Sequence, residues 1–247
     1  EDEFSSDVTN FFGLQKYLIQ DDLDETTGRV AYELDVNDDT MIYVSYTKGF
    51  KPGGSNLTFG YPMDNEGFGA APAPQLIFPF FESEMIDAYE LGLKTDFMEG
   101  RMRANVSAFT YDYENLQFQS TDPDIYRGGV ANIPESEMKG IELELIGLVS
   151  ESLSFDLRVA YLDTEITSSY EALDNLNAEL YFFGEEPIRY SLREDLRGNK
   201  LAKSPELTAN LGVEYITETA YGLLTSTAEW IYRGDFQQRV FNNPFVA

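Results

Sequence analysis

The chain alternates apolar and polar residues with a period of two along much of its 247-residue length. Apolar or aromatic residues recur at every second position with polar residues between them, which is the pattern of a β-strand with two unlike faces. The clearest runs cover residues 29–34, 42–47, 89–94, 101–108, 141–146, 153–161, 207–215 and 224–232. In each run one phase carries no charge over its central stretch, so we predict about eight strands.

Short and long connections alternate strictly between these strands. The short ones, near residues 36–39, 97–100, 149–152 and 217–220, are rich in the residues of tight turns. The long ones cover roughly residues 51–83, 119–137 and 168–204. An up-and-down antiparallel sheet then has every short turn at one end and every long loop at the other, as transmembrane β-barrels do. In a compact soluble domain, loops of this length would count against the strand assignment.

The alternation alone also fits a soluble β-sandwich, whose sheets have one buried and one hydrated face. Two features favour a membrane. The strands are about ten or more residues long, against roughly 5–6 in soluble proteins. Aromatic residues also gather near strand ends, where outer-membrane barrels carry their girdles; the predicted girdle comprises Tyr43, Tyr46, Phe50, Tyr111, Tyr113, Trp230 and Tyr232. The predicted fold is therefore an all-β, antiparallel, transmembrane up-and-down β-barrel.

The segment YVSYTKGFKPGG, residues 43–54, has the pattern of a strand that leaves a bilayer. Its uncharged phase, which includes Tyr46, would face lipid, and its two lysines follow where headgroups and water begin. Pro52 has no N–H for a neighbouring strand, so we expect the ladder to end there. We expect Gly53 and Gly54 to supply positive φ angles for the turn outward.

Composition excludes several functions. The chain has 44 acidic and 17 basic residues, a formal net charge of -27, which argues against nucleic acid as a partner. It has no Cys and no His, so disulfides, Ser-His-Asp or Cys-His catalysis and nearly all zinc chemistry are excluded. The sequence contains no run of 18 apolar residues, so it predicts no transmembrane helix. We predict no enzymatic activity and no cofactor.

Four motifs carry a resemblance to a known family. They are Tyr43–Gly54, quoted above; Glu84 followed by YELGLK at 89–94; Asn105, Phe109, YDY at 111–113 and NLQ at 115–117; and Asn132 followed by GIELE at 140–144. In this order and spacing, across roughly residues 28–161, the chain resembles the barrel of TonB-dependent outer-membrane receptors, particularly the iron-complex group.

The resemblance implies a location in the bacterial outer membrane and a barrel of about 22 strands. It also implies an N-terminal plug domain, energy from the TonB complex through a short N-terminal box, and import of a scarce nutrient. Residues 1–247 show neither the plug nor the box, so we expect a barrel segment of a longer receptor. The implied partners are outer-membrane lipid, the TonB complex and a ferric siderophore or other iron complex. Corrinoids and oligosaccharides stay open as ligands.

The long loops would meet the ligand, and exposed aromatic or cationic side chains there are the candidate contacts. The candidates are Tyr61, Phe68, Phe80 and Phe81 in the first loop, Tyr126 and Arg127 in the second, and Arg189 and Arg193 in the third. On a helix, Arg189, Arg193 and Arg197 would share one face and could bind an anionic chelate. The competing interpretation is that the aromatics pack the loops and the arginines pair with nearby acidic residues.

Other chemistry is weakly indicated. Glu142, Glu144 and Asp156 fall on the polar phase, where a channel wall is expected to be polar. The acidic run at 35–39 fails the calcium-loop pattern, so no metal site is predicted. Glycines inside strands, at 92, 140 and 212, indicate close approach or bulges. The alternatives to a receptor are a soluble β-sandwich that binds carbohydrate, a passive porin-like barrel and, last, a glycosidase.

Overall fold

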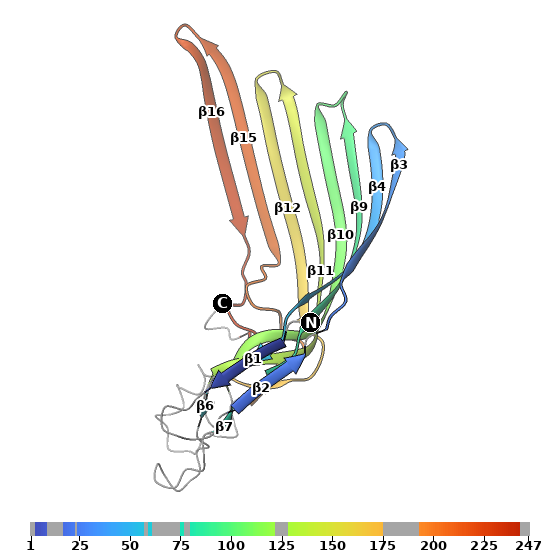
Figure 1. Ribbon diagram of the computed structural model, residues 1–247. Helices are drawn as coiled ribbons and strands as arrows, with labels where there is room; N and C mark the ends of the chain where they lie inside the picture. Colours follow the sequence, from blue (N-terminus) through green and yellow to red (C-terminus); the bar gives the residue numbers. More distant parts are fainter. Residues whose placement is uncertain are drawn as a thin grey trace, which may run out of the picture.

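Eight long strands form one antiparallel sheet in the computed structural model (Figure 1). The structure describes the backbone of residues 3–8, 17–22, 24–56, 59–60, 75–76, 80–121, 128–174 and 193–242, and the side chains of residues 24–56, 80–121, 128–174 and 193–242. The eight strands are β3 (Gly28–Asn37), β4 (Thr40–Lys51), β9 (Glu84–Phe97), β10 (Met102–Thr121), β11 (Gly128–Ser150), β12 (Leu153–Ile166), β15 (Leu207–Thr219) and β16 (Gly222–Arg233).

The strand order is β16-β15-β12-β11-β10-β9-β4-β3, so each long strand pairs with its sequence neighbour among the long strands. This up-and-down order and the eight strands of 10 to 23 residues confirm the sequence predictions. Within the described residues β3 and β16 are the two edges, and the sheet is open. An open sheet with two long edges is the geometry expected of a barrel segment, because a closed barrel has no edges.

All the short hairpin turns lie at one end of the sheet, which we call the turn end (Figure 1). Between β9 and β10, Met98, Glu99 and Gly100 all have positive φ, at 55°, 62° and 77°. Between β15 and β16, Gly222 has φ 125°, which favours glycine over any residue with a Cβ. The connections predicted to be long lie at the opposite end, the loop end, so the predicted gathering of all the short turns at one end of the sheet is confirmed.

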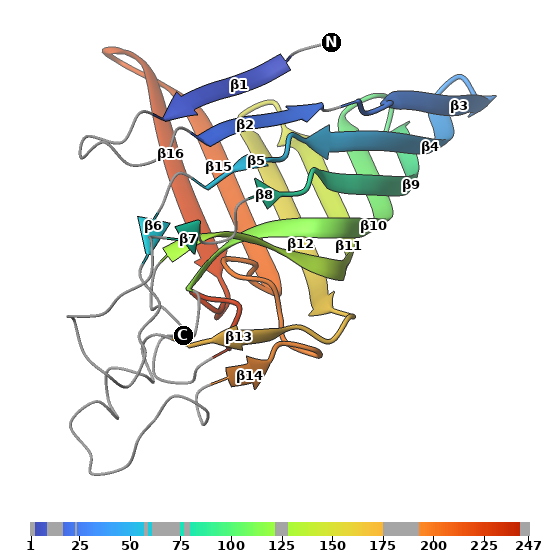
Figure 2. The same ribbon diagram turned by 60° about the horizontal axis from the view of Figure 1, so that its bottom comes forward.

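Short two-stranded ladders lie at the loop end (Figure 2). They pair β1 (Glu3–Val8) with β2 (Tyr17–Asp22), β5 (Gly54–Ser55) with β8 (Phe80–Phe81), β6 (Phe59–Gly60) with β7 (Gln75–Leu76), and β13 (Glu171–Leu173) with β14 (Arg193–Asp195).

Two local predictions are wrong. The second long loop is much shorter than residues 119–137, because β10 and β11 stay paired as far as Thr121 and Gly128. Beyond the apolar part of the sheet neither face needs an apolar row, so the alternation disappears while the ladder continues. Gly53 and Gly54 do not adopt positive φ. They are required for space: a Cβ at Gly53 would lie 2.5 Å from the Phe81 carbonyl oxygen, and one at Gly54 would lie 2.8 Å from the Phe81 ring.

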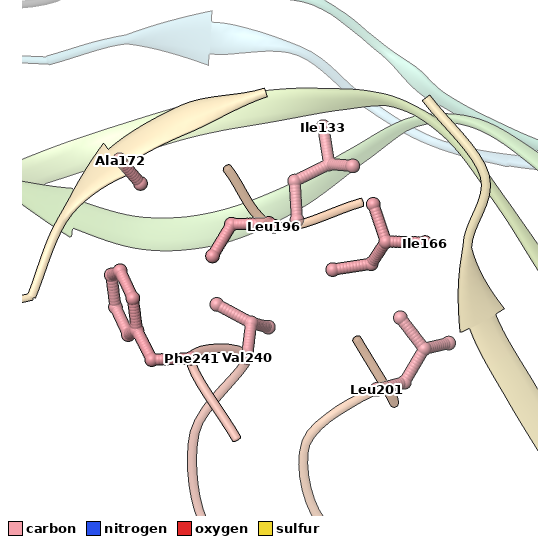
Figure 3. Packing of buried hydrophobic residues seen from close by; sticks show 7 residues of the cluster. All are labelled: Ile133, Ile166, Ala172, Leu196, Leu201, Val240 and Phe241. Carbon is pink, nitrogen blue, oxygen red and sulfur yellow. The ribbon is translucent and has the colours of Figure 1, made fainter. Parts of the chain in front are cut away.

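A small hydrophobic core sits at the loop end (Figure 3). Its buried members are Ile133, Ile166, Ala172, Leu196, Leu201, Val240 and Phe241. The first two belong to β11 and β12, and the others to segments 170–174, 193–202 and 239–242, which together we call the cap. Backbone and side-chain bonds join its parts: Asn199 donates to the Val240 carbonyl at 2.9 Å and Asn242 accepts from the Lys200 N–H at 2.6 Å. The cap therefore unites two segments that are separated by the β15–β16 hairpin.

Candidate functional site

One face of the sheet is apolar from edge to edge, and we call it the apolar face. Strand register aligns one row of Leu34, Ile42, Leu93, Val106, Leu143, Val159, Ala209 and Tyr232, and a second row of Tyr32, Val44, Leu91, Ala108, Ile141, Tyr161 and Leu207. These side chains are not covered: Leu91 is 57% exposed and Ile141 is 54% exposed. A soluble sandwich would bury such rows in a shared core, and an uncovered patch of this extent marks a membrane or protein contact.

The apolar face ends abruptly toward the loop end. Tyr46 and Tyr89 face each other across β4 and β9 with ring centroids 5.1 Å apart. The next row on the same face holds Lys48, Asp87, Asp112, Glu137 and Glu165, all charged. The Tyr46 hydroxyl donates to the Asp87 carboxylate and so joins the tyrosine pair to the charged row. On β10, β11 and β12 the row of the two tyrosines already holds Thr110, Lys139 and Asp163. A tyrosine pair beside polar and charged positions is the profile of a surface passing from hydrocarbon through headgroups into water.

The opposite face carries the charges, and we call it the polar face. Its central row includes Lys94, Asn105, Glu144 and Arg158 on four successive strands. The Glu144 carboxylate accepts from Asn105 Nδ2 at 2.8 Å and from Arg158 Nε at 3.2 Å. Nearer the turn end Arg103 binds both carboxylate oxygens of Asp96, at 2.6 and 2.9 Å. The charged groups are therefore linked laterally from strand to strand across the sheet.

Glycines on the polar face let neighbouring side chains lie flat against the backbone. The Tyr43 ring covers Gly92, where a Cβ would come within 2.1 Å of it. Its hydroxyl donates to the Glu90 carboxylate, and Lys94 Nζ lies 5.5 Å from its ring centroid. A Cβ at Gly140 would lie 2.4 Å from the Phe109 ring, and one at Gly212 would lie 2.3 Å from the Asp156 carboxylate. The predicted close approach at the three strand glycines is confirmed.

A groove of about 580 Å³ lies along the polar face. Tyr43, Glu90, Lys94, Glu142 and Glu144 are among the side chains that line it. Of the three carboxylates predicted for a channel wall, Glu144 and Asp156 have Arg158 within 3.2 and 3.5 Å. This arrangement provides a hydrated, mostly acidic wall with fixed positive charges.

Only three of the eight predicted ligand contacts fall within the residues whose side chains are described. Phe80 is 46% exposed, and Phe81 packs on Gly54 through the β5–β8 ladder. Arg193 begins strand β14, so the shared helical face considered for Arg189, Arg193 and Arg197 does not form at that position. Tyr61, Phe68, Tyr126, Arg127 and Arg189 lie outside the described residues. Among the described residues, no interaction brings Phe80, Phe81 and Arg193 together at one site.

Two interactions at the loop end were missed in the sequence. Arg239 reaches the buried Asp174 carboxylate at 2.5 Å, joining the two parts of the cap. Gln117 and Asn132 hold the two ends of the first long loop with their carboxamides. In the sequence Gln117 and Asn132 stand out only as letters of the family motifs, because their partners are 17 to 66 positions away.

Comparison with known proteins gives a direct assignment. A family model described as "TonB dependent receptor-like, beta-barrel" matches residues 2–246. The chain belongs to this family. Its barrels lie in the bacterial outer membrane, and its members are transport receptors.

Individual relatives of the receptor barrel agree with this placement. A probable TonB-dependent siderophore receptor, PiuA, from Acinetobacter baumannii is 24% identical over 217 residues, 87% of this chain and 27% of the relative. A ferric-pyoverdine 358 receptor from Pseudomonas putida is 29% identical over 118 residues, 47% of this chain and 12% of the relative. The chain therefore spans about a quarter or less of the length of these curated relatives.

Solved structures show the same fold. The siderophore receptor PiuA from A. baumannii superposes with a TM-score of 0.63 at 20% identity, over 94% of this chain and 29% of that one. The ferric yersiniabactin uptake receptor FyuA from Yersinia pestis gives a TM-score of 0.64 at 18% identity, with the same two coverages. Each match places this chain on less than a third of a longer receptor chain.

In a receptor barrel the apolar face meets lipid and the polar face lines the interior. Tyr46, Phe50, Trp230 and Tyr232 are on the apolar-face phase, and the Trp230 and Tyr232 rings stack with centroids 6.0 Å apart. Three girdle assignments are wrong, those of Tyr43, Tyr111 and Tyr113, because their positions alternate with the apolar rows and point to the polar face. Closeness to a strand end fixes the height of a ring in the membrane but not the face on which it lies.

Within the described ranges, no helix is long and apolar enough to cross a membrane. The same residues contain no group of three or more Asp and Glu side chains placed to hold a metal ion.

Proposed function

We propose that this chain forms part of the wall of an outer-membrane receptor that imports a ferric siderophore or another iron complex with energy from the TonB system. The observation that carries the proposal is the pairing of an uncovered apolar face with a charged, laterally bonded face across eight strands of the receptor family. Such a wall separates hydrocarbon from a water-filled interior.

The ligand class comes from the relatives. Curated matches are described as siderophore or ferric-pyoverdine receptors, and FyuA as a ferric yersiniabactin uptake receptor. We propose that the plug domain and the TonB box belong to a longer receptor that includes residues 1–247. The matched lengths of 27% and 29% of the relatives support that arrangement. We also propose that the receptor is not an enzyme, since the family consists of transport receptors.

Uptake by the full-length receptor tests this function. The gene would be expressed in an outer-membrane receptor mutant that is starved of iron, and cells would be given radioiron as a panel of ferric hydroxamate, catecholate and carboxylate siderophores. The proposal expects accumulation of at least one chelate, abolished by deletion of the TonB system. Accumulation that is independent of TonB would instead indicate a passive porin-like barrel. Uptake of labelled cobalamin or maltooligosaccharide with no iron chelate transported would reassign the ligand class.

A further inference from the structure

We infer that Gln117 and Asn132 are positioning residues, which fix where the loop between β4 and β9 leaves the barrel wall. The parts of the loop that they hold are residues 51–56 and 80–84, which we call the stem. The inference rests on the proposed function only in treating this loop as part of the receptor mouth, and its test needs no transported ligand.

The regular ladder between β9 and β10 stops just below the stem. Its last pair is Met85 with Glu114, and the next residue of β10, Asn115, has φ 57°. The β10–β11 register passes over Asn115 and Pro134, and Pro134 has no N–H to offer. Past this point β10 and β11 continue as a pair while β4 and β9 end at Lys51 and Glu84. Between this point and the β5–β8 ladder, residues 52–53 and 82–83 therefore have no strand partner.

Side chains supply the missing bonds. The Glu84 carboxylate accepts from the Gln117 backbone N–H at 2.8 Å. The Gln117 carboxamide nitrogen has three carbonyl oxygens within bonding distance: Pro52 at 2.8 Å, Glu82 at 3.2 Å and Lys51 at 3.4 Å. Two of these carbonyls belong to the outgoing end of the stem and one to the returning end. A single side chain thus holds both ends at one point.

Asn132 acts beside it from the next strand. Gln117 and Asn132 are Cα partners in the β10–β11 register. The Asn132 Oδ1 accepts from the Glu82 N–H at 2.8 Å, and its Nδ2 donates to the Glu82 carbonyl at 3.0 Å and to the Asn115 carbonyl at 2.7 Å. It therefore pairs with Glu82 as a neighbouring strand would, through one donor and one acceptor.

A third carboxamide repeats this geometry further along the stem. The Asn56 Nδ2 donates to the Val130 carbonyl at 2.8 Å, and its Oδ1 accepts from the Val130 N–H at 2.9 Å. Asn56 is buried, with 7% of its surface exposed. Only a carboxamide offers a donor and an acceptor at this spacing, because a carboxylate only accepts and an ammonium only donates. The residue type at 132, as at 56, is thereby explained by the backbone N–H and carbonyl that the side chain binds, whereas Gln117 uses its nitrogen as a donor to carbonyl oxygens.

Amide hydrogen exchange on the full-length receptor tests the inference. Gln117→Glu turns a donor toward three carbonyl oxygens into an acceptor, and we expect peptides covering residues 80–84 to exchange about tenfold faster, the factor equivalent to 1.4 kcal/mol. The matched control is Gln119→Glu, an exposed residue two positions along β10, which should leave the stem unchanged. Asn132→Asp keeps the acceptor for the Glu82 N–H but turns an acceptor toward the Glu82 and Asn115 carbonyls, so protection of that N–H should fall in part, whereas Asn132→Leu should remove it.

A general structural role makes a different prediction. If Gln117 merely supported the whole barrel, peptides around the β15–β16 turn would accelerate as much as those of the stem. Equal acceleration at both places, or an unchanged stem in Gln117→Glu, would overturn the inference. Loss of radioiron uptake in the parent receptor bears on the proposed function alone, because the exchange measurement is independent of the ligand.

Discussion

Arg239 lies 2.5 Å from the carboxylate of Asp174, through Nη1, and Asp174 is fully buried at the loop end of the sheet. Asp174 directly follows β13 and Arg239 lies beyond β16, so their contact closes the cap across the β15–β16 hairpin. The ring of Phe241 lies 4.8 Å from the Arg239 guanidinium carbon and shields the pair from one side.

Removing the cation should damage the cap more than removing both charges. We expect Arg239→Met to destabilise the cap, by up to about 3–5 kcal/mol, since the buried Asp174 carboxylate loses its ion pair with Arg239. The double variant with Asp174→Asn should recover much of that loss. Rates of limited proteolysis within residues 193–202 measure the effect, and Arg233→Met, on the exposed strand β16, serves as the control. Equal cleavage of the single variant and the unaltered receptor would show that the ion pair does not hold the cap.

Two adjacent residues of β10 provide a test of which face meets lipid. Ala108 lies in an apolar row, while Ser107 faces the polar side with Glu142 as its Cα partner. A lysine on the lipid side of a barrel costs about 2–4 kcal/mol near the midplane, so Ala108→Lys should sharply reduce the folded fraction. Ser107→Lys should be tolerated, because it places the same charge among carboxylates. Heat-modifiable migration of the receptor in gels reports the folded fraction, and the reverse order of sensitivity would reverse the two faces.

Gly92 is expected to be intolerant of side chains as long as the Tyr43 ring covers it. Gly92→Val should lower stability by about 1–3 kcal/mol, the usual range for overpacking. In a Tyr43→Ala background the same change should cost much less, since the atoms it would meet are those of the Tyr43 ring. Urea unfolding of the four proteins of this cycle measures the coupling. Additive effects would mean that the ring moves aside without cost and does not fix the glycine.

The sequence alone predicts the strands correctly wherever the bilayer excludes charged residues from one face of the sheet. Rows such as that of Val44, Leu91 and Ile141 must be uncharged, and the resulting alternation predicted the strands and their order. Beyond the headgroups charged residues are allowed on both faces and the alternation disappears. The sequence pattern therefore does not predict that β10 continues to Thr121. Tyr43 was assigned to the lipid side because its height in the strand was considered and its phase was not.

The contacts at the loop end depend on strand register and on how the loops fold. A local sequence pattern predicts neither. Nothing near Gln117 in the sequence indicates that its carboxamide meets carbonyls 35 to 66 residues earlier. The Asp174–Arg239 pair, 65 residues apart, is equally invisible to periodicity. The sequence shows only that residues 56, 117 and 132 each carry a carboxamide. Their shared role emerges only when the ends of β4 and β9 are seen beside β10 and β11.

The link between β14 and residues 169–170 should weaken in acid. The Arg197 backbone N–H and then the Ser169 hydroxyl donate to the Asp195 carboxylate, and with the Tyr170 N–H they lower the pKa of Asp195 below its ordinary value of 3.8. A carboxyl whose pKa falls on folding stabilises the folded form above its unfolded pKa, and this stabilisation is lost as the pH drops toward the folded pKa. The link should therefore be fully formed at neutral pH and loosen below about pH 4.

Amide exchange at Tyr170 and Arg197, corrected for the intrinsic effect of pH on exchange, measures this loosening. Asp195→Asn keeps an acceptor oxygen but cannot titrate, so the acid-dependent part of the exchange should disappear while some protection remains. The matched control is Glu171→Gln, at the exposed Cα partner of Asp195 in the β13–β14 ladder, which should retain the full pH dependence. If Asp195→Asn and the unaltered receptor respond alike to acid, another carboxyl governs the loop, and Asp195 is only one of several groups that cap its backbone.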